Sequence, residues 1–321
     1  MFKHLWACLL LIVMAQAIQA AASTPQVVAT IKPIHALVSG IMKGVETPYL
    51  LLPGGESPHR YSLYPSQVRR LHAATLVIWV GPTVESFLEK TLTTLSTSTQ
   101  ILRLIDIPGL TRLKVRKGKV WETHHYHVDA DHHTDFEIDP HIWLSPENAK
   151  ILVQTIAQTL IKRDTNNAER YTANATRLIK QLEQLDQDLK QELSAVRGIP
   201  FLVFHDAYQY FEQHYGLKAI GAVSLSSEIR PSVKRLYKLK RQLKRHKIHC
   251  VFSEPQFESA LVDTLIENSS AQRGILDPLG AKLPAETKSY LTLLRNMADS
   301  IKECLQTVSY THLTLPTICS V

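Results

Sequence analysis

The alternation of short apolar runs with amphipathic stretches predicts an α/β protein with two lobes. The alternation occupies residues 27–90 and returns over residues 201–276, with a long helical segment between the two halves. Strands that alternate with helices are typical of parallel sheets covered by helices. We therefore expect two Rossmann-like lobes with mainly parallel sheets, joined by a long rigid interlobe helix.

Composition places the chain among globular proteins, and its first residues point to export. Of its 321 residues, 45% are hydrophobic and 20% are charged, which argues against disorder. Residues 1–22 combine a basic start, an apolar run and small residues before a cleavage site, as in a secretory signal peptide. The apolar run of roughly 14 residues is shorter than the ~20 that span a bilayer. The formal charge of +7 would permit a nucleic-acid partner, but for an exported, soluble protein we expect none.

Strands and helices can be assigned through the first half of the chain. Residues 76–80 form a continuous apolar run, as expected for a strand in a parallel sheet covered on both faces. A Pro-Gly-Gly breaker at residues 53–55 ends an earlier strand. The other strands are expected over residues 27–31 and 49–52, and the helices over residues 35–42, 65–71 and 83–90.

The second half repeats the pattern. Strands are expected over residues 201–204, 219–223, 248–252 and 274–276, and helices over residues 207–214 and 231–247. The last of these helices is strongly basic, which is most often the mark of a solvated face.

A long helical signal separates the two halves. Ser145 as N-cap and Pro146 as first residue make a good helix start, and a second helix is expected over residues 166–197. Its apolar residues recur at 3-, 4- or 7-residue steps. About 32 residues at ~1.5 Å each extend roughly 48 Å, enough to cross a lobe. A coiled-coil dimer is one interpretation, but the flanking α/β units favour an interlobe strut in a monomer.

These assignments divide the chain into five parts. They are a signal peptide (1–22), an N-terminal lobe (23–164), the connecting helix (165–197), a C-terminal lobe (198–305) and an atypical tail (306–321). Residues 309–317 resemble translated adapter or vector sequence, so the tail is left out of the fold prediction. Within the first lobe, residues 122–137 are polar and aperiodic, which predicts a mobile loop. This loop contains His124, His125, His127, His132 and His133.

Two cysteines lie in structured-looking segments. Cys250 and Cys304 could form a disulfide in an oxidising compartment, or remain as two buried thiols. Because the chain carries an export signal, we favour the disulfide.

Four potential metal ligands lie where strands end or a helix begins. His59, His205 and Asp277 follow expected strands, and His141 lies just before the capped helix start. Ligands of open α/β sheets bind outside the carboxyl ends of the strands. Four such residues from two lobes therefore predict a metal site in the cleft. Three imidazoles with a carboxylate or water suit tetrahedral Zn²⁺ better than Mn²⁺, Ca²⁺ or Mg²⁺.

Six short segments form a specific combination of motifs. They are Ser57–Leu63 with Pro65–Ser66, Leu76–Pro82, Asp139–Pro146, His205–Phe211, Ser253–Phe257 and Leu276–Gly280. Together they resemble the ZnuA family, the zinc-binding solute-binding proteins of bacterial ABC importers. The resemblance extends over roughly residues 26–305.

The resemblance implies a site, a function and a compartment. It implies that His59, His141 and His205 hold zinc between the lobes, with Asp277 or water as fourth ligand. It also implies an auxiliary metal loop at residues 122–137 and a disulfide between Cys250 and Cys304. The implied function is high-affinity capture of zinc in the periplasm and its delivery to an ABC permease, without catalysis. The basic helix at 231–247 would then be a solvated face or a docking surface for the permease.

Two features of the sequence bear on the choice of metal. Some relatives have Glu immediately before the first ligand, where this chain has Pro58, so a fourth ligand from that position is excluded. Manganese-type relatives commonly carry Glu where this chain has His205, which favours zinc. Binding of manganese or another divalent metal is the alternative.

Other functional classes are less consistent with the sequence. A secreted zinc hydrolase would also use three His and a water. However, the chain has no His-Glu-x-x-His helix and no Gly-x-Ser-x-Gly elbow. An adhesin-like surface protein is disfavoured because the sequence has no lipid-anchor signal. We therefore expect a binding protein and no enzyme.

Overall fold

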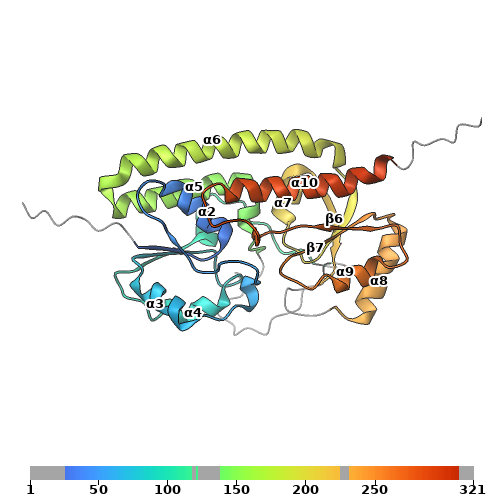
Figure 1. Ribbon diagram of the computed structural model, residues 1–321, viewed down its shortest axis with the longest axis horizontal. Coiled ribbons are helices and arrows are strands. Elements are labelled where there is room, and N and C mark those ends of the chain that lie inside the picture. Colours follow the sequence, from blue (N-terminus) through green and yellow to red (C-terminus); the bar gives the residue numbers. More distant parts are fainter. Residues whose placement is uncertain (1–25, 118–120, 122–137, 225–230, 311–321) are drawn as a thin grey trace, which may run out of the picture.

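The computed structural model describes residues 26–117, 121, 138–224 and 231–310, which fold into two α/β lobes (Figure 1). The sheet of the N-terminal lobe contains β1 (Val27–Ala29), β2 (Tyr49–Leu50), β3 (Leu76–Trp79) and β4 (Gln100–Arg103). Its helices are α2 (Lys32–Ile41), α3 (Pro65–Ala73) and α4 (Glu89–Leu92). The predicted strands of this half are confirmed, and β4 is an additional edge strand.

The C-terminal lobe repeats this architecture. Its sheet contains β5 (Pro200–Val203), β6 (Lys218–Ala222), β7 (Cys250–Ser253) and β8 (Gln272–Ile275). Its helices are α7 (Gln209–Tyr215), α8 (Val233–Arg245) and α9 (Ala260–Ile266). Every strand pair within the two sheets is parallel, as predicted.

The two sheets share one strand order, which determines where a ligand can bind. The order is β2-β1-β3-β4 in the first lobe and β6-β5-β7-β8 in the second. In each sheet the chain leaves the first strand toward one neighbour and later returns to its other side. The crevice at such a reversal, beyond the carboxyl ends of the two inner strands, is the usual ligand site of open α/β sheets. Here these pairs are β1 with β3, and β5 with β7.

Three long helices pack together along one side of the two lobes (Figure 1). They are α5 (Pro146–Arg163), α6 (Ala168–Glu192) and α10 (Ser289–Tyr310). Helix α6 runs along one edge of both lobes, beside α5, α2 and α10 (Figure 1). The predicted long helix is therefore confirmed. Within the described ranges, no helix has the length and apolar character needed to cross a membrane.

Helix α10 is a second connection between the lobes. It packs against α2 of the first lobe and β8 of the second. No element was predicted for this segment, although the buried side chains of α10 recur at helical spacing: Tyr290, Leu293, Leu294, Met297, Ala298 and Ile301. The helix also runs past residue 305, the predicted end of the second lobe. Two helices thus link the lobes, and the larger of the two hydrophobic clusters among the described residues extends across both lobes.

One predicted helix is largely replaced by a turn. Residues 83–90 contain a short 3-10 helix (Ser86–Leu88) and only the first residues of α4. The reason is Glu85, whose buried carboxylate accepts hydrogen bonds from the backbone N–H groups of Val80 and Gly81, at 3.0 Å each. These bonds fold the chain back onto the end of β3 and interrupt the helical ladder.

A disulfide joins Cys250 on β7 to Cys304 on α10, with 6.0 Å between the two Cα atoms. The preferred cysteine pairing is confirmed. The bond closes a loop of 54 residues and fastens the second sheet to α10. Replacing both cysteines by serine should lower the free energy of unfolding by about 2–4 kcal/mol, because the unfolded chain regains conformational freedom.

Urea denaturation of the oxidised parent and the double-serine variant would measure this change. Zinc titration is the control, because neither cysteine lines the candidate site described below. A variant with unchanged unfolding energy would contradict the prediction.

Candidate metal centre

His59 lies in a 3-10 turn (Pro58–Arg60) that follows β2. Its Nδ1 lies 3.1 Å from the backbone carbonyl oxygen of Thr83, in the turn after β3. A carbonyl oxygen can only accept, so Nδ1 must carry the proton. The lone pair of Nε2 is therefore free to bind a metal.

His141 lies just before the 3-10 helix Ile142–Leu144, which leads into α5. Its Nδ1 lies 2.7 Å from Oδ1 of Asp139, and the same oxygen accepts the backbone N–H of His141 at 3.0 Å. When this carboxylate is ionised, the contact requires a proton on Nδ1, so Nε2 again keeps a free lone pair. A carboxylate behind an imidazole is the usual outer partner of a metal-binding histidine.

His205 directly follows β5, and its partner follows the adjacent strand β7. Its Nδ1 lies 2.6 Å from Oε1 of Glu254, which also accepts the backbone N–H of His205 at 3.3 Å. This pair therefore occupies the strand-order reversal of the second sheet. In His205, as in the other two histidines, Nδ1 is hydrogen-bonded and Nε2 remains available to bind a metal.

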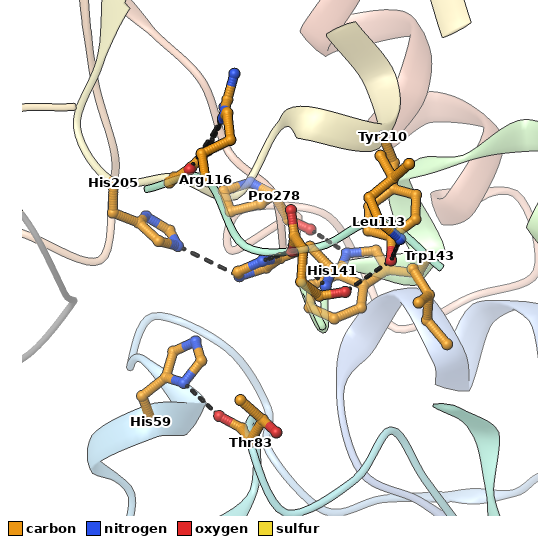
Figure 2. A network of polar contacts seen from close by, with 12 residues as sticks. His59, Thr83, Leu113, Arg116, His141, Trp143, His205, Tyr210 and Pro278 are labelled. Atoms are coloured by element: carbon orange, nitrogen blue, oxygen red, sulfur yellow. Dashed lines mark hydrogen bonds and ion pairs between the residues drawn. The ribbon is translucent and has the colours of Figure 1, made fainter. Parts of the chain in front are cut away.

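The three imidazoles converge on one point between the lobes (Figure 2). One candidate ligand atom from each of His59, His141 and His205 lies within 4.8 Å of the other two. The Nε2 atoms of His141 and His205 are 3.4 Å apart. Two nitrogens at ~2.05 Å from a tetrahedral Zn²⁺ would be about 3.3 Å apart. The spacing of this pair therefore matches one edge of a zinc tetrahedron.

The space among the three rings accommodates an ion. The cavity has a volume of about 10 Å³ and its walls include Trp143, Phe257 and Leu279. A volume of that order holds about one water molecule, whereas pockets for organic ligands measure about 300–1,000 Å³. The chemistry that this cavity supports is coordination of a single cation.

Burial sets the protonation of the three rings. Desolvation, with a smaller contribution from the neighbouring imidazoles, lowers the pKa of His59 and of His141 to about 3. Burial alone would also lower the pKa of His205, but the charge and hydrogen bond of Glu254 outweigh it and raise that pKa above its usual value. Burial raises the pKa of Asp139 to about 7.

Two carboxylates give this site a negative charge just outside the imidazoles. Oδ2 of Asp139 and Oε2 of Glu254 are buried and have no hydrogen-bond partner within the described part of the chain. A divalent cation held by neutral imidazoles would be balanced by these two carboxylates. The donor set and its surroundings therefore fit a doubly charged ion.

The structure does not bring Asp277 into the group of histidines. Its carboxylate accepts the backbone N–H groups of Leu279, Gly280 and Ala281 at 2.6–3.1 Å, and the side-chain amide of Gln256 at 2.8 Å. These bonds shape a loop whose Leu279 forms part of the cavity wall. Asp277 was predicted as a metal ligand because it directly follows a strand. Its oxygens instead accept hydrogen bonds from the backbone of the turn that follows.

Arg116 attaches the first lobe to the second behind His205. Its guanidinium pairs with both carboxylate oxygens of Asp206 and with Glu212 on α7 at 2.8 Å, and it stacks on Trp121 at 3.6 Å from the ring centre. Asp206, the residue directly after His205, is thereby held by Arg116 of the first lobe.

Tyr210 on α7 makes a second link to the same part of the first lobe. Its hydroxyl accepts the backbone N–H of Leu113 at 3.0 Å and donates to the backbone carbonyl of Asp139 at 2.7 Å. Helix α7 thereby holds the residue that orients His141.

Sequence reasoning identified the three histidines but not their partners. Asp139 and Glu254 stood within the quoted motifs without a role. The sequence position of Glu254 could have indicated its role, because Glu254 lies just after a predicted strand, as His205 does. No comparable signal existed for Arg116, because only the fold places it against α7. The auxiliary histidines His124, His125, His127, His132 and His133 lie outside the described residues, as do the signal peptide and residues 311–321.

A second group of possible ligands is already satisfied. Ligand atoms of Glu147, Asp186 and His214 lie within 4.8 Å of one another. However, Asp186 pairs with Lys190 at 2.7 Å and with His214 at 2.6 Å. Burial alone would raise the pKa of Asp186, but these contacts outweigh it and lower that pKa to about 2. The group is therefore explained as a packing contact between helices.

Comparison with known proteins agrees with the site. Residues 27–304 match the family described as "ZnuA: Zinc-uptake complex component A periplasmic". The chain is 40% identical over 304 residues to the high-affinity zinc uptake system protein ZnuA of Brucella abortus, covering 87% of this chain and 91% of the relative.

Solved structures share the fold. A crystal structure of ZnuA superimposes with a TM-score of 0.76 at 26% identity, covering 88% of this chain and all of the other. The Mn²⁺ complex of FpvC from Pseudomonas aeruginosa has the same TM-score at 24% identity, covering 89% of this chain and all of the other, which is evidence for the fold alone. With the family match extending over nearly the whole described chain, this protein belongs to the ZnuA family of periplasmic zinc-uptake components.

Proposed function

We propose that this protein binds zinc in the periplasm and delivers it to the membrane permease of an ABC importer. The observation that carries the proposal is the convergence of three Nε2 atoms whose partner nitrogens are all hydrogen-bonded outward. The relatives' names as zinc uptake proteins support the same function. The protein acts as a carrier and catalyses no reaction.

Zinc fits the donor set better than manganese. All three donors are imidazole nitrogens, a borderline ligand that suits Zn²⁺, whereas Mn²⁺ prefers carboxylate oxygen. The two nearby carboxylates already hold the outer nitrogens of His141 and His205. We propose that a water molecule, rather than Asp277, completes the tetrahedron. A site of this kind stays open to exchange at the fourth position.

The remaining parts of the proposal concern regions outside the site. The disulfide is consistent with an oxidising compartment, and residues 1–22 would direct export. We propose that His124, His125, His127, His132 and His133 form an auxiliary site that collects zinc before the cleft. We also propose that the protein acts as a monomer, because α6 is packed along both lobes.

A metal titration tests the proposal directly. Metal-free protein should bind one tight equivalent of Zn²⁺ in a competition assay with a chelator of known affinity, and excess Mn²⁺ should not displace it. Deleting residues 122–137 should remove weaker equivalents and keep the tight one. Tight binding of Mn²⁺ in preference to Zn²⁺, or loss of the tight site with the loop, would overturn the assignment.

The pH dependence of zinc binding should show that zinc displaces fewer protons here than it would from three histidines with ordinary pKa values. With their pKa values lowered to about 3, His59 and His141 are already neutral at pH 5–8. The protons to displace belong to His205, whose pKa is raised, and to Asp139, whose pKa is about 7. Zinc affinity should therefore be constant well above these pKa values and fall as the pH drops through them.

Between pH 4 and pH 6, the slope of the logarithm of zinc affinity against pH should approach two, which corresponds to two protons released per zinc bound. Calorimetry in buffers of different ionisation enthalpy counts the released protons directly. Three histidines with the usual pKa of about 6.5 would release three, and that result would refute the protonation states inferred from the structure.

A further inference from the structure

Helix α8 on the C-terminal lobe carries a concentrated positive charge. Residues 231–250 contain eight Lys and Arg residues and no Asp or Glu. The helix lies on the side of its lobe away from α6 and α10 (Figure 1). The outer face of α8 therefore takes no part in the contacts between the lobes or in the metal site.

The two faces of α8 have different roles. The inner face packs Leu239 and Leu243 into the smaller hydrophobic core of this lobe. Arg235 is also buried and donates to the backbone carbonyls of Ala222 and Val223 at 2.6 and 2.9 Å. The outer face carries exposed residues at helical spacing, which are Lys234, Tyr237, Lys238, Arg241, Lys244 and Arg245. This set is called the basic stripe below.

Four cations of the basic stripe are not neutralised by their described surroundings. Within the described ranges, Lys234, Arg241, Lys244 and Arg245 form no ion pair. Helix α9 packs against α8, but its Asp263 is paired with Arg273 at 2.8 Å. Among the described residues, Lys234, Arg241, Lys244 and Arg245 therefore present four unpaired cations along a helix of 13 residues, which extends about 20 Å at ~1.5 Å per residue.

Exposed apolar side chains accompany the cations. Val233 is 84% exposed and Tyr237, one turn later, is 66% exposed. Large hydrophobic side chains this exposed are few in the described part of the chain, and two of them stand on α8. Tyrosine has an apolar ring and a polar tip, which suits the boundary between lipid headgroups and water.

From these observations we propose that α8 binds the surface of a bilayer containing anionic phospholipid. A row of cations without interspersed acids complements a laterally uniform negative surface, and such clusters are attracted to anionic headgroups. A protein partner would instead need a negative patch of matching shape, an outcome that the test below includes. Binding would concentrate the carrier where the proposed permease resides, and it requires no zinc. The inference therefore extends the proposed function without depending on the metal site.

Vesicle sedimentation tests the inference with the full mature chain. The protein should pellet with vesicles of phosphatidylcholine and phosphatidylglycerol at low salt, and stay in solution with phosphatidylcholine alone. Binding should fall at least tenfold at high salt, because exposed charges are screened. The metal-free and the zinc-loaded protein should bind alike.

Matched variants separate the basic stripe from the net charge of the chain. The variant K234Q/R241Q/K244Q/R245Q should lose at least tenfold in vesicle binding and retain zinc affinity. The control K43Q/R69Q/K90Q/K180Q removes the same charge from exposed positions elsewhere and should bind nearly as the parent does. Tyr237→Ser should weaken binding at unchanged charge.

Three outcomes would overturn the proposal. The first is equal loss in the stripe variant and the control, which would indicate only non-specific attraction by net charge. The second is equal binding to neutral vesicles. The third is binding only to vesicles that contain a permease, which would identify a protein as the partner. Zinc titration of the same samples shows separately whether the proposed function holds.

Discussion

Replacing His205 by alanine should weaken zinc binding roughly a hundredfold or more. Loss of an outer partner of a metal ligand already costs about 10–100-fold, and this change removes a ligand itself. It also leaves the buried carboxylate of Glu254 without the imidazole that it now contacts at 2.6 Å. His141→Ala should have an equally large effect, because its Nε2 forms the other end of the 3.4 Å edge. Competition titration with a zinc chelator would measure both.

Suitable controls keep this prediction specific. His72 is exposed on α3, so His72→Ala should leave zinc affinity unchanged. Glu254→Gln keeps the shape of the partner but removes its charge, and should fall between the parent and His205→Ala. If the alanine variants at positions 141 and 205 bound zinc as the parent does, the site would have to lie elsewhere.

Replacing Arg116 by methionine should destabilise the protein by about 3–5 kcal/mol, the usual cost of removing one partner from a buried ion pair. Asp206 and Glu212 would lose the guanidinium that now holds them. Zinc affinity should fall as well, because Asp206 is the neighbour of His205. Urea denaturation measures the first effect and chelator competition the second.

The pH dependence of this variant has a defined sign. Burial already raises the pKa of Asp206 and Glu212, and Arg116 opposes the increase. Without Arg116, both pKa values should rise further above those of the unfolded chain. Stability contributed by carboxyl groups with a raised pKa is lost as the pH rises, so the variant should lie closer to the parent at pH 5 than at pH 8.

An exposed ion pair provides the comparison. Arg273 pairs with Asp263 at 2.8 Å, and the side chains of both are more than a third exposed. Arg273→Met should therefore change the free energy of unfolding by less than about 1 kcal/mol. Equal losses in the two methionine variants would mean that Arg116 contributes no more than a surface charge. Arg116→Lys keeps the charge but loses the forked geometry, and should recover part of the stability.

Local patterns were sufficient for the elements that depend on periodicity. The four residues Leu76–Trp79 form a buried strand because a continuous apolar run suits a sheet covered on both faces. Helix α6 follows from its apolar stripe, and α5 from Ser145, whose hydroxyl accepts the N–H of Asn148 at 3.2 Å. The stripe of α10 was equally readable in the sequence and was missed.

Local patterns failed where a distant or competing hydrogen bond decides the backbone. Residues 83–90 have helical propensity, but the carboxylate of Glu85 binds the end of β3 instead. Asp277 looked like a ligand because it follows a strand, yet backbone N–H groups of the next turn occupy it. In both cases a carboxylate, buried in Glu85 and partly buried in Asp277, satisfies backbone donors that would otherwise be unpaired.

By itself, the sequence determined the α/β class, the two lobes, the long helix and the three histidines, because periodic burial and position after a strand are local properties. The tertiary structure decided which acids stand behind those histidines, that Asp277 stays outside the group, and that Arg116 fastens one lobe to the other. The contacts of Glu254 with His205 and of Arg116 with Asp206 join residues 49 and 90 positions apart. The first depends on the pairing of β5 with β7 within one sheet, and the second on how the two lobes are placed against each other, so a local pattern determines neither.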